Sequence, residues 1–185
     1  MLIGWADNWD YVDKAPAAED GYQGAMTLAR KISLGKYRGE YRICQRFAGL
    51  PDPFQYPEVT AEQIDLDPDG ALDLTVVSED GSWIALGNDL GEELILSCSD
   101  TEWTIDRSRA GKGDLSGKFC SDRTGMIRFQ KKFADGRLRM IFDRSILEME
   151  GDDGLTSATI DVYPNAPYTK VRMSGLKNCR IGTVR

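Results

Sequence analysis

Histidine is absent from this chain of 185 residues. Ser-His-Asp and Cys-His catalytic arrangements and most catalytic zinc sites need an imidazole as base or ligand. The sequence therefore excludes these chemistries, and any acid–base catalysis would depend on carboxylates. We expect neither a metal nor a cofactor.

Cysteine is scarce and irregularly placed. The chain has four cysteines, and none of them forms a CxxC pair. This spacing favours buried free thiols over a zinc site and leaves a disulfide open. The four residues are Cys44, Cys98, Cys120 and Cys179.

Long apolar runs and basic runs are also missing. No apolar run approaches the roughly 18 residues that cross a bilayer, and the start of the chain lacks a basic region and a cleavage site. The formal net charge is -7, which repels nucleic acid and anionic membranes. We therefore expect a cytoplasmic protein without nucleic-acid or membrane partners.

What the sequence does contain is the rhythm of β-strands. Apolar segments alternate or run for about five to eight residues before a Gly, Asp, Asn or Pro cluster ends them. With 41% hydrophobic residues, the chain is long enough for one main core. The candidate strands are Leu2-Trp5, Ala25-Leu34, Tyr41-Phe47, Ala71-Val77, Trp83-Gly87, Glu93-Cys98, Glu102-Asp106, Met126-Phe133, Leu138-Asp143, Ile146-Met149, Ser157-Tyr163, Lys170-Ser174 and Cys179-Val184.

The spacing of turns indicates how these strands are organised. Signals such as Glu79-Asp80-Gly81 recur about every eight to twelve residues, which favours an all-β sandwich. The best helical pattern is a short one around Thr60-Gln63, with Thr60 as its cap. The stretch from Ala48 to Glu58 holds three prolines and predicts a linker or a stiff connection along a domain surface.

Acidic and basic residues form two patterns with more than one interpretation. Asp65-Gly70 begins like a calcium loop, but the position that should supply a bidentate Glu is Val76, so an acidic turn is favoured. Asp106-Arg107-Ser108 and Asp143-Arg144-Ser145 repeat one tripeptide at strand ends. Ion pairs that fix the strand ends are favoured there, with a ligand cleft as the alternative.

The N-terminal aromatic residues also have two interpretations. Trp5, Trp9 and Tyr11 stand among acidic and amide residues that include Asn8. Flat rings beside such groups suit a sugar, whose ring has apolar CH faces and hydroxyl edges. Ordinary core packing is the other interpretation, and the residues alone favour it.

Several segments, taken together, resemble a known family. They are GWADNWDY, GAMTLARKISL, YRICQRF, WTIDRSRAG and LRMIFDRSILEMEGDDGLTSATIDVYP. In this order they resemble the C-terminal part of glycoside hydrolase family 32, the sucrose, sucrose-6-phosphate and fructan hydrolases, from Leu2 to about Pro164. Members have an N-terminal β-propeller with the active site, followed by a β-sandwich.

The resemblance implies a division of the chain. Residues 1–47 would be the remnant of the last propeller blade, 48–57 the linker, and 58–185 a concanavalin-like β-sandwich. The opening MLIGWADNWDY then reads as the interior of a larger enzyme. We expect residues 2–34 to expose apolar surface that a propeller would cover.

The same resemblance bears on activity. The family uses an Asp in a WMNDPNG-like segment, a Glu in an EC segment and an Asp in an RDP segment, and none of these segments occurs in this sequence. It therefore implies no catalytic residue and no activity for this chain alone. Trp5 matches a position near the fructose subsite, and Asn8 is a second substrate-binding candidate from the same loop.

Two roles follow as expectations. One is a C-terminal module that supports the propeller domain of a parent β-fructosidase and contributes to a homo-oligomer. The alternative is a free-standing sandwich that binds carbohydrate. The sequence departs from the family pattern at two positions. Ala29 stands where the family usually has proline before Arg30, and Glu150 stands where it usually has an aromatic residue. The charge of Glu150 predicts altered packing of the strand that carries it.

Overall fold

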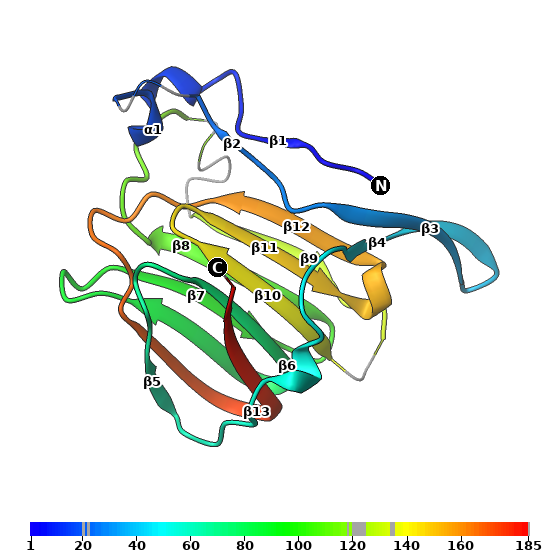
Figure 1. Cartoon of the computed structure of the whole chain (residues 1–185). Coiled ribbons are helices and arrows are strands. Elements are labelled where there is room, and N and C mark those ends of the chain that lie inside the picture. Colours follow the sequence, from blue (N-terminus) through cyan, green and yellow to red (C-terminus); the bar gives the residue numbers. More distant parts are fainter. Residues whose placement is uncertain (20, 22, 118, 120–124, 134–135, 185) are drawn as a thin grey trace.

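The protein is built almost wholly of antiparallel β-strands (Figure 1). The computed structural model describes residues 1–19, 21, 23–117, 119, 125–133 and 136–184. The strands are β1 (Trp5–Ala6), β2 (Ala25–Met26), β3 (Arg30–Tyr37), β4 (Glu40–Phe47), β5 (Gln63–Asp65), β6 (Ala71–Gly87), β7 (Glu93–Cys98), β8 (Glu102–Arg109), β9 (Met126–Gln130), β10 (Arg137–Asp143), β11 (Ile146–Gly151), β12 (Thr156–Asp161) and β13 (Lys170–Val184). Short helical turns are η1 (Val12–Lys14), α1 (Pro16–Glu19), η2 (Pro53–Gln55) and η3 (Asp152–Gly154). The predicted all-β class is confirmed.

One sheet of nine strands, counted over the described residues, forms the body of the molecule. Its order is β12-β11-β10-β6-β7-β8-β9, with β13 beside β6 and β5 beside β13. The first half of β6 pairs with β10 and its second half with β7, while β13 follows both halves. The sheet thus folds over on itself into two layers (Figure 1), and the predicted sandwich is confirmed.

The fold-over occurs where the sequence predicts a turn. Instead of ending at Glu79-Asp80-Gly81, β6 continues through a bend, and Gly81 there has a φ of +76°. The register of β13 against β6 shifts beside Gly175, whose φ is +70°. Bulges of this kind bend a strand from one layer into the next. The pairs of strands expected at 71–87 and 170–184 are therefore two long, bent strands.

The core lies between the two layers. Leu74, Trp103 and Met149 have no exposed surface, because alternate residues of β6, β8 and β11 point inward. The Trp103 indole N–H donates to Ser78 Oγ at 3.1 Å, and that hydroxyl donates to the carbonyl of Gly136 at 2.7 Å. The polar end of the largest core side chain is therefore satisfied.

The structure corrects the prediction for one segment and adds detail to that for another. The helix expected around Thr60-Gln63 is wrong, because residues 63–65 form β5 and pair with β13. Pairing with a distant strand outweighs a weak local helical preference. The proline-rich stretch lies against the outer face of the sheet, where the Tyr56 hydroxyl donates to Asp73 at 3.1 Å.

The thiol prediction is confirmed for the residues that the structure describes. Cys44, Cys98 and Cys179 are free and buried, while Cys120 lies outside the described residues. The helices found in the described part of the chain are too short to cross a membrane.

Candidate functional site

The outer face of one layer is charged and covered. Outward-pointing residues of neighbouring strands form a polar row across β11, β10 and β6, with Glu150 opposite Arg139 and Arg139 opposite Thr75. In the next row Asp73 is completely buried and accepts hydrogen bonds from Arg139 Nε at 2.9 Å and Nη2 at 2.5 Å. Such a face normally meets water. Here segments between residues 28 and 56 cover it.

A buried ion pair fastens the N-terminal strands to this face. Arg30 at the start of β3 lies 2.6 Å from Glu148 of β11, and their side chains are only 6% and 3% exposed. The second carboxylate oxygen of Glu148 accepts a hydrogen bond from the backbone N–H of Leu28 at 2.5 Å. Arg30 also donates to the Ala158 carbonyl at 3.0 Å. Because both charges are buried and paired, loss of either partner is costly.

Glu150 makes a second attachment. Its carboxylate accepts a hydrogen bond from the backbone N–H of Phe47, at the end of β4, at 2.7 Å. Burial raises the pKa of Glu150 above its usual range. Nearby, Arg46 lies 3.3 Å from Asp153. Glu150, at a position that the family resemblance predicts to be aromatic, thus makes a polar contact with β4.

A third attachment joins the N-terminal loop to β12. The Tyr11 hydroxyl donates to Asp161 at 2.9 Å, and Tyr11 packs edge-on against Phe119. Arg107 lies over the Phe119 ring at 4.0 Å and donates to the Asp161 carbonyl at 2.9 Å. The Arg107 side chain therefore holds the two partners of Tyr11, Phe119 through a ring contact and Asp161 through its backbone carbonyl, and no ion pair with Asp106 is seen among the described residues.

Asp161 makes this attachment sensitive to pH. Burial is the largest cause that raises the pKa of Asp161 to about 6; the Tyr11 hydrogen bond opposes it, Asp7 adds to it, and Arg107 lowers it. A carboxyl with a raised pKa binds its proton more tightly in the folded state. It therefore contributes stability below about pH 4, and this is lost as the pH rises through about 6.

We expect Asp161→Asn to remove this pH dependence. Asparagine keeps an acceptor for Tyr11, and the shift of Asp161 corresponds to about 3 kcal/mol. Relative to the wild type, the variant should gain up to that free energy of unfolding between pH 4 and pH 7. Urea unfolding at both pH values measures it. An equal difference between the two proteins at both values would contradict the prediction.

The predicted substrate-binding residue Trp5 lies in β1, opposite Met26 of β2. Its ring is 38% exposed and lies 5.0 Å, centroid to centroid, from that of Trp9, which is 80% exposed. The indole N–H of Trp5 donates to the Gln23 carbonyl at 3.1 Å. Gly24, at a φ of +70°, passes so close that a Cβ would lie 2.4 Å from that nitrogen. The two rings form an exposed aromatic platform.

Asn8 has a local structural contact. Its side-chain oxygen accepts the backbone N–H of Asp10 at 2.9 Å, and its own N–H donates to Asp7 at 2.7 Å. Such Asx turns fix the path of a loop. The second oxygen of Asp7 is buried without a hydrogen-bond partner among the described residues. Whether Trp5 and Asn8 contact a sugar stays a prediction.

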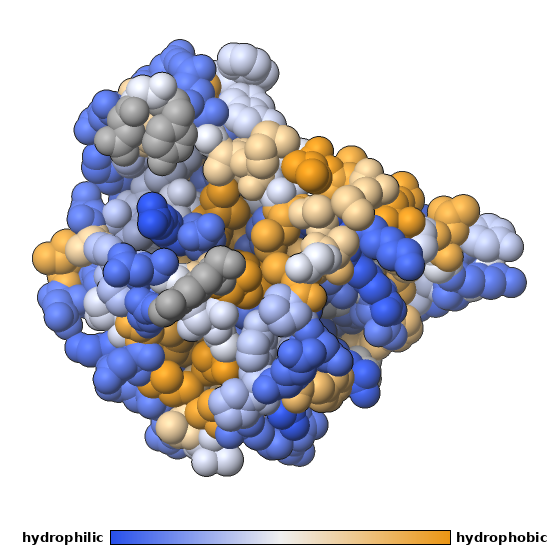
Figure 2. All heavy atoms as spheres, in the orientation of Figure 1, coloured by the Kyte–Doolittle hydropathy of each residue, from blue (hydrophilic) through white to orange (hydrophobic). Residues whose placement is uncertain are grey.

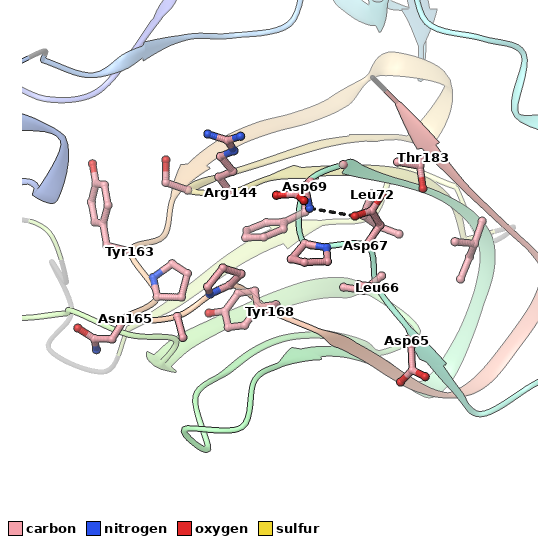
Figure 3. Close-up of a pocket in the computed structure, with 18 of the residues that line it drawn as sticks. Asp65, Leu66, Asp67, Asp69, Leu72, Arg144, Tyr163, Asn165, Tyr168 and Thr183 are labelled. Carbon is pink, nitrogen blue, oxygen red and sulfur yellow. Dashed lines mark hydrogen bonds between the residues drawn. The ribbon is translucent and has the colours of Figure 1, made fainter. Parts of the chain in front are cut away.

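A groove of about 560 Å³ opens on the sandwich itself. Figure 3 shows Arg144 on its upper wall, Asp67 and Asp69 on the loop beside it, and Asn165 and Tyr168 on the segment below. Trp5 and Asn8 are not among the residues that line it. The ligand-cleft interpretation therefore still applies to Asp143-Arg144-Ser145, the second of the repeated tripeptides, because Arg144 lines this groove.

The acidic loop in this groove is a turn held by its own backbone. Asp69 N–H donates to the Asp67 carboxylate at 3.1 Å, and Gly70 N–H to the Asp67 carbonyl at 3.3 Å. Across the described ranges, His, Cys, Asp and Glu side chains do not gather in a group of three that could hold a metal. The acidic turn favoured from the sequence is what the structure shows.

The clamp residues Arg30 and Glu148 were not identified as functional from the sequence. Both lie in segments that carry the family resemblance. One signal in the sequence marks this site. Glu148 lies between the apolar Leu147 and Met149 of a strand, which indicates that its carboxylate is on the outer face and, if covered, must be paired. The spacing of residues does not reveal which cation pairs with this carboxylate, because Arg30 and Glu148 are 118 residues apart in the sequence.

Comparison with known proteins gives the family. Residues 88–178 match the model of glycosyl hydrolases family 32, C terminal. A levanbiose-producing levanase from Bacillus subtilis (strain 168) is 24% identical over 182 residues, which cover 88% of this chain and 34% of the levanase. The chain thus spans about a third of that relative's length.

Solved structures share the fold. An exo-inulinase from Aspergillus awamori matches 97% of this chain with a TM-score of 0.70 and 18% identity, over 38% of its own chain. A sucrose-6-phosphate hydrolase from Lactobacillus gasseri matches 98% with a TM-score of 0.61 and 15% identity, over 37% of its chain. Residues 88–178 thus carry the C-terminal domain of glycosyl hydrolases family 32, and almost the whole chain shares its fold with these enzymes.

Proposed function

We propose that this chain is the C-terminal module of a β-fructosidase, and that its sandwich holds the strands of residues 1–47 in position for the propeller of that enzyme. The buried clamp between Arg30 and Glu148 carries the proposal. We infer that this buried ion pair fixes the placement of the N-terminal strands on the sandwich. The names of the relatives, levanase and exo-inulinase, support fructans as the substrate class.

The outward side of the N-terminal strands supports a partner. Leu34 is 71% exposed and Ile43, its cross-strand neighbour, 60%. Figure 2 shows hydrophobic side chains gathered along the edge formed by the N-terminal segment and the β3–β4 hairpin. Exposed apolar surface on an unpaired hairpin marks an interaction site. We assign it to the preceding strands of a propeller.

The proposal predicts how the isolated chain behaves. Without a propeller, the chain should self-associate as its concentration rises, and Leu34→Lys with Ile43→Lys should make it monomeric while leaving its circular dichroism unchanged. Sedimentation equilibrium measures this. Lys36→Glu, on the same strand, is the matched control and should leave association unchanged. A strict monomer with uniform hydrogen-exchange protection of residues 1–47 would count against the proposal.

The proposal also predicts that the chain alone releases no fructose from sucrose or levan, because retaining hydrolysis needs two carboxyl groups about 5 Å apart across the scissile bond. We place those groups in the propeller. Steady fructose release that substitution of this chain's own carboxylates abolishes would overturn this part of the proposal.

A free-standing carbohydrate-binding module is the second candidate, and the exposed Trp5–Trp9 platform favours it. Calorimetric titration with levan oligosaccharides separates the two. Under the first candidate the isolated chain shows no saturable binding. Under the second it binds, and Trp9→Ala weakens binding about tenfold, because the ring would stack on the sugar. Phe54→Ala is the control, because Phe54 is 75% exposed and lies outside the platform.

A further inference from the structure

Two acidic residues lie where the N-terminal segment meets the end of β12. Asp161, the last residue of β12, is only 9% exposed, and the Tyr11 hydroxyl donates to its carboxylate at 2.9 Å. Asp7 follows β1, which packs against β12. Burial raises the pKa of Asp161, and the charge of Asp7 raises it further. Two carboxylates in a poorly hydrated place repel each other, so the pair favours the binding of a proton.

One oxygen of Asp7 has no donor in the part of the chain that the structure describes. Oδ1 accepts the backbone N–H of Asn8 at 2.7 Å, whereas Oδ2 is shielded from water and makes no hydrogen bond there. Gly24 closes over the side chain, because a Cβ at that position would lie 2.7 Å from the Cβ of Asp7. A shielded acceptor without a donor is uncommon in native proteins. A proton bound by the two carboxyl groups would supply one.

The other groups around Asp161 offset its charge only in part. Arg107 of β8 lowers the effect of burial on its pKa, but its printed contact is with the Asp161 backbone carbonyl, at 2.9 Å. Tyr163, two residues further along the chain, stays neutral because burial raises its pKa. Ile146, opposite Asp161 on β11, is apolar. Tyr11 is therefore the residue seen to donate to the carboxylate within the described ranges.

We propose that Asp7 and Asp161 share one proton in acid, and that this proton holds the N-terminal loop, residues 7–15, against β12. When the proton leaves, two negative charges remain in a poorly hydrated place, and the loop opens more often so that water can solvate them. Trp9 lies in this loop, so the position of the aromatic platform changes with it. The change is internal to the chain and does not depend on a propeller.

Hydrogen exchange of the whole chain between pH 4 and pH 7 tests the proposal. The amides of Val12 and Ala15 report on the loop, because they donate to the carbonyls of Asn8 at 2.9 Å and Tyr11 at 3.0 Å. A carboxyl with a raised pKa favours the closed loop in acid, and this preference is lost as the pH rises. After correction for the intrinsic exchange rate, protection should fall roughly fiftyfold and level off above about pH 6.

Four variants separate the contributions to the pair. Asp161→Asn should abolish the pH dependence of the loop amides. Asp7→Asn should lower the pH at which protection levels off, because the charge of Asp7 favours the proton. Tyr11→Phe should raise that pH, because the hydrogen bond from the hydroxyl favours the ionised carboxylate. Asp13→Asn, which changes an exposed carboxylate of the same loop, is the matched control and should behave as the wild type.

Dilute urea distinguishes opening of the loop from unfolding of the whole chain. Local opening exposes little surface, so urea should leave the protection of Val12 and Ala15 unchanged while it lowers that of Leu96, a buried residue of β7. If urea lowers all three equally, the loop opens only when the chain unfolds, and the proposal is wrong. Protection of the loop that does not change with pH, or a shift in the same direction in Asp7→Asn and Tyr11→Phe, also overturns it.

Discussion

Replacing Glu148 with alanine is expected to lower the free energy of unfolding by about 3–5 kcal/mol. The carboxylate pairs with Arg30 at 2.6 Å and accepts the Leu28 N–H at 2.5 Å, and both side chains of the ion pair are buried. Removal of Glu148 leaves a buried guanidinium without its anion and a backbone donor without its acceptor. Urea unfolding at neutral pH measures the loss.

The exposed ion pair of the β3–β4 hairpin is the matched control. Arg42 and Glu40 also pair, but their side chains are 57% and 67% exposed, so Glu40→Ala should change stability by less than about 1 kcal/mol. The Leu28 amide should exchange its hydrogen faster in Glu148→Ala only. If the two variants lose equal stability, the buried pair does not hold the N-terminal strands.

Trp103→Ala is expected to cost about 3–5 kcal/mol as well. The side chain has no exposed surface, packs within about 3 Å of where a Cβ on Gly151 would lie, and hydrogen-bonds Ser78 across the fold-over. Its loss leaves a cavity between the layers. Trp103→Phe should cost less, because it keeps most of the ring volume and loses the hydrogen bond. Thermal and urea unfolding compare the variants.

The control for this prediction is Trp9, whose ring is 80% exposed. Trp9→Ala should alter stability by no more than about 0.5 kcal/mol. Comparable losses for Trp9→Ala and Trp103→Ala would show that the stability of the chain does not depend on the core between the layers.

Short alternating strands could be predicted well from the sequence. The expected strand at Glu93-Cys98 has the bounds of β7, and Leu138, Met140 and Phe142 face the core as the alternation of β10 predicts. These residues follow a local rule, since one face of a strand is apolar and its ends carry turn residues. The family resemblance added the overall fold.

Features that depend on distant pairing could not be predicted. Gly81 looks like the end of a strand, yet β13 continues the pairing on both sides of it and keeps β6 as one strand. Gln63 belongs to β5 only because Ile64 pairs with Val171. The local signal at Gly81 predicts a turn and that around Gln63 a short helix, and in both places pairing with β13 decides the outcome.

The candidate site also has features that could be predicted from the sequence and features that could not. The exposed aromatic pair of Trp5 and Trp9 follows from the sequence as a candidate, since the two residues stand four positions apart. The ion pair of Arg30 and Glu148 does not, because these residues meet only after the sheet has formed. Charged residues on a strand indicate an outer face but not what covers it.

The covered outer face has a consequence for aggregation. Its groups are hydrophilic, among them Asp73, Arg139, Glu148 and Glu150. When the N-terminal strands lift away, water can solvate these groups, and Ile141, which lies between Asp73 and Glu148 on this face, is an apolar side chain among them. Local opening of this kind is common in proteins. A mostly charged face should therefore lower the tendency of the sandwich to aggregate while its N-terminal strands are detached.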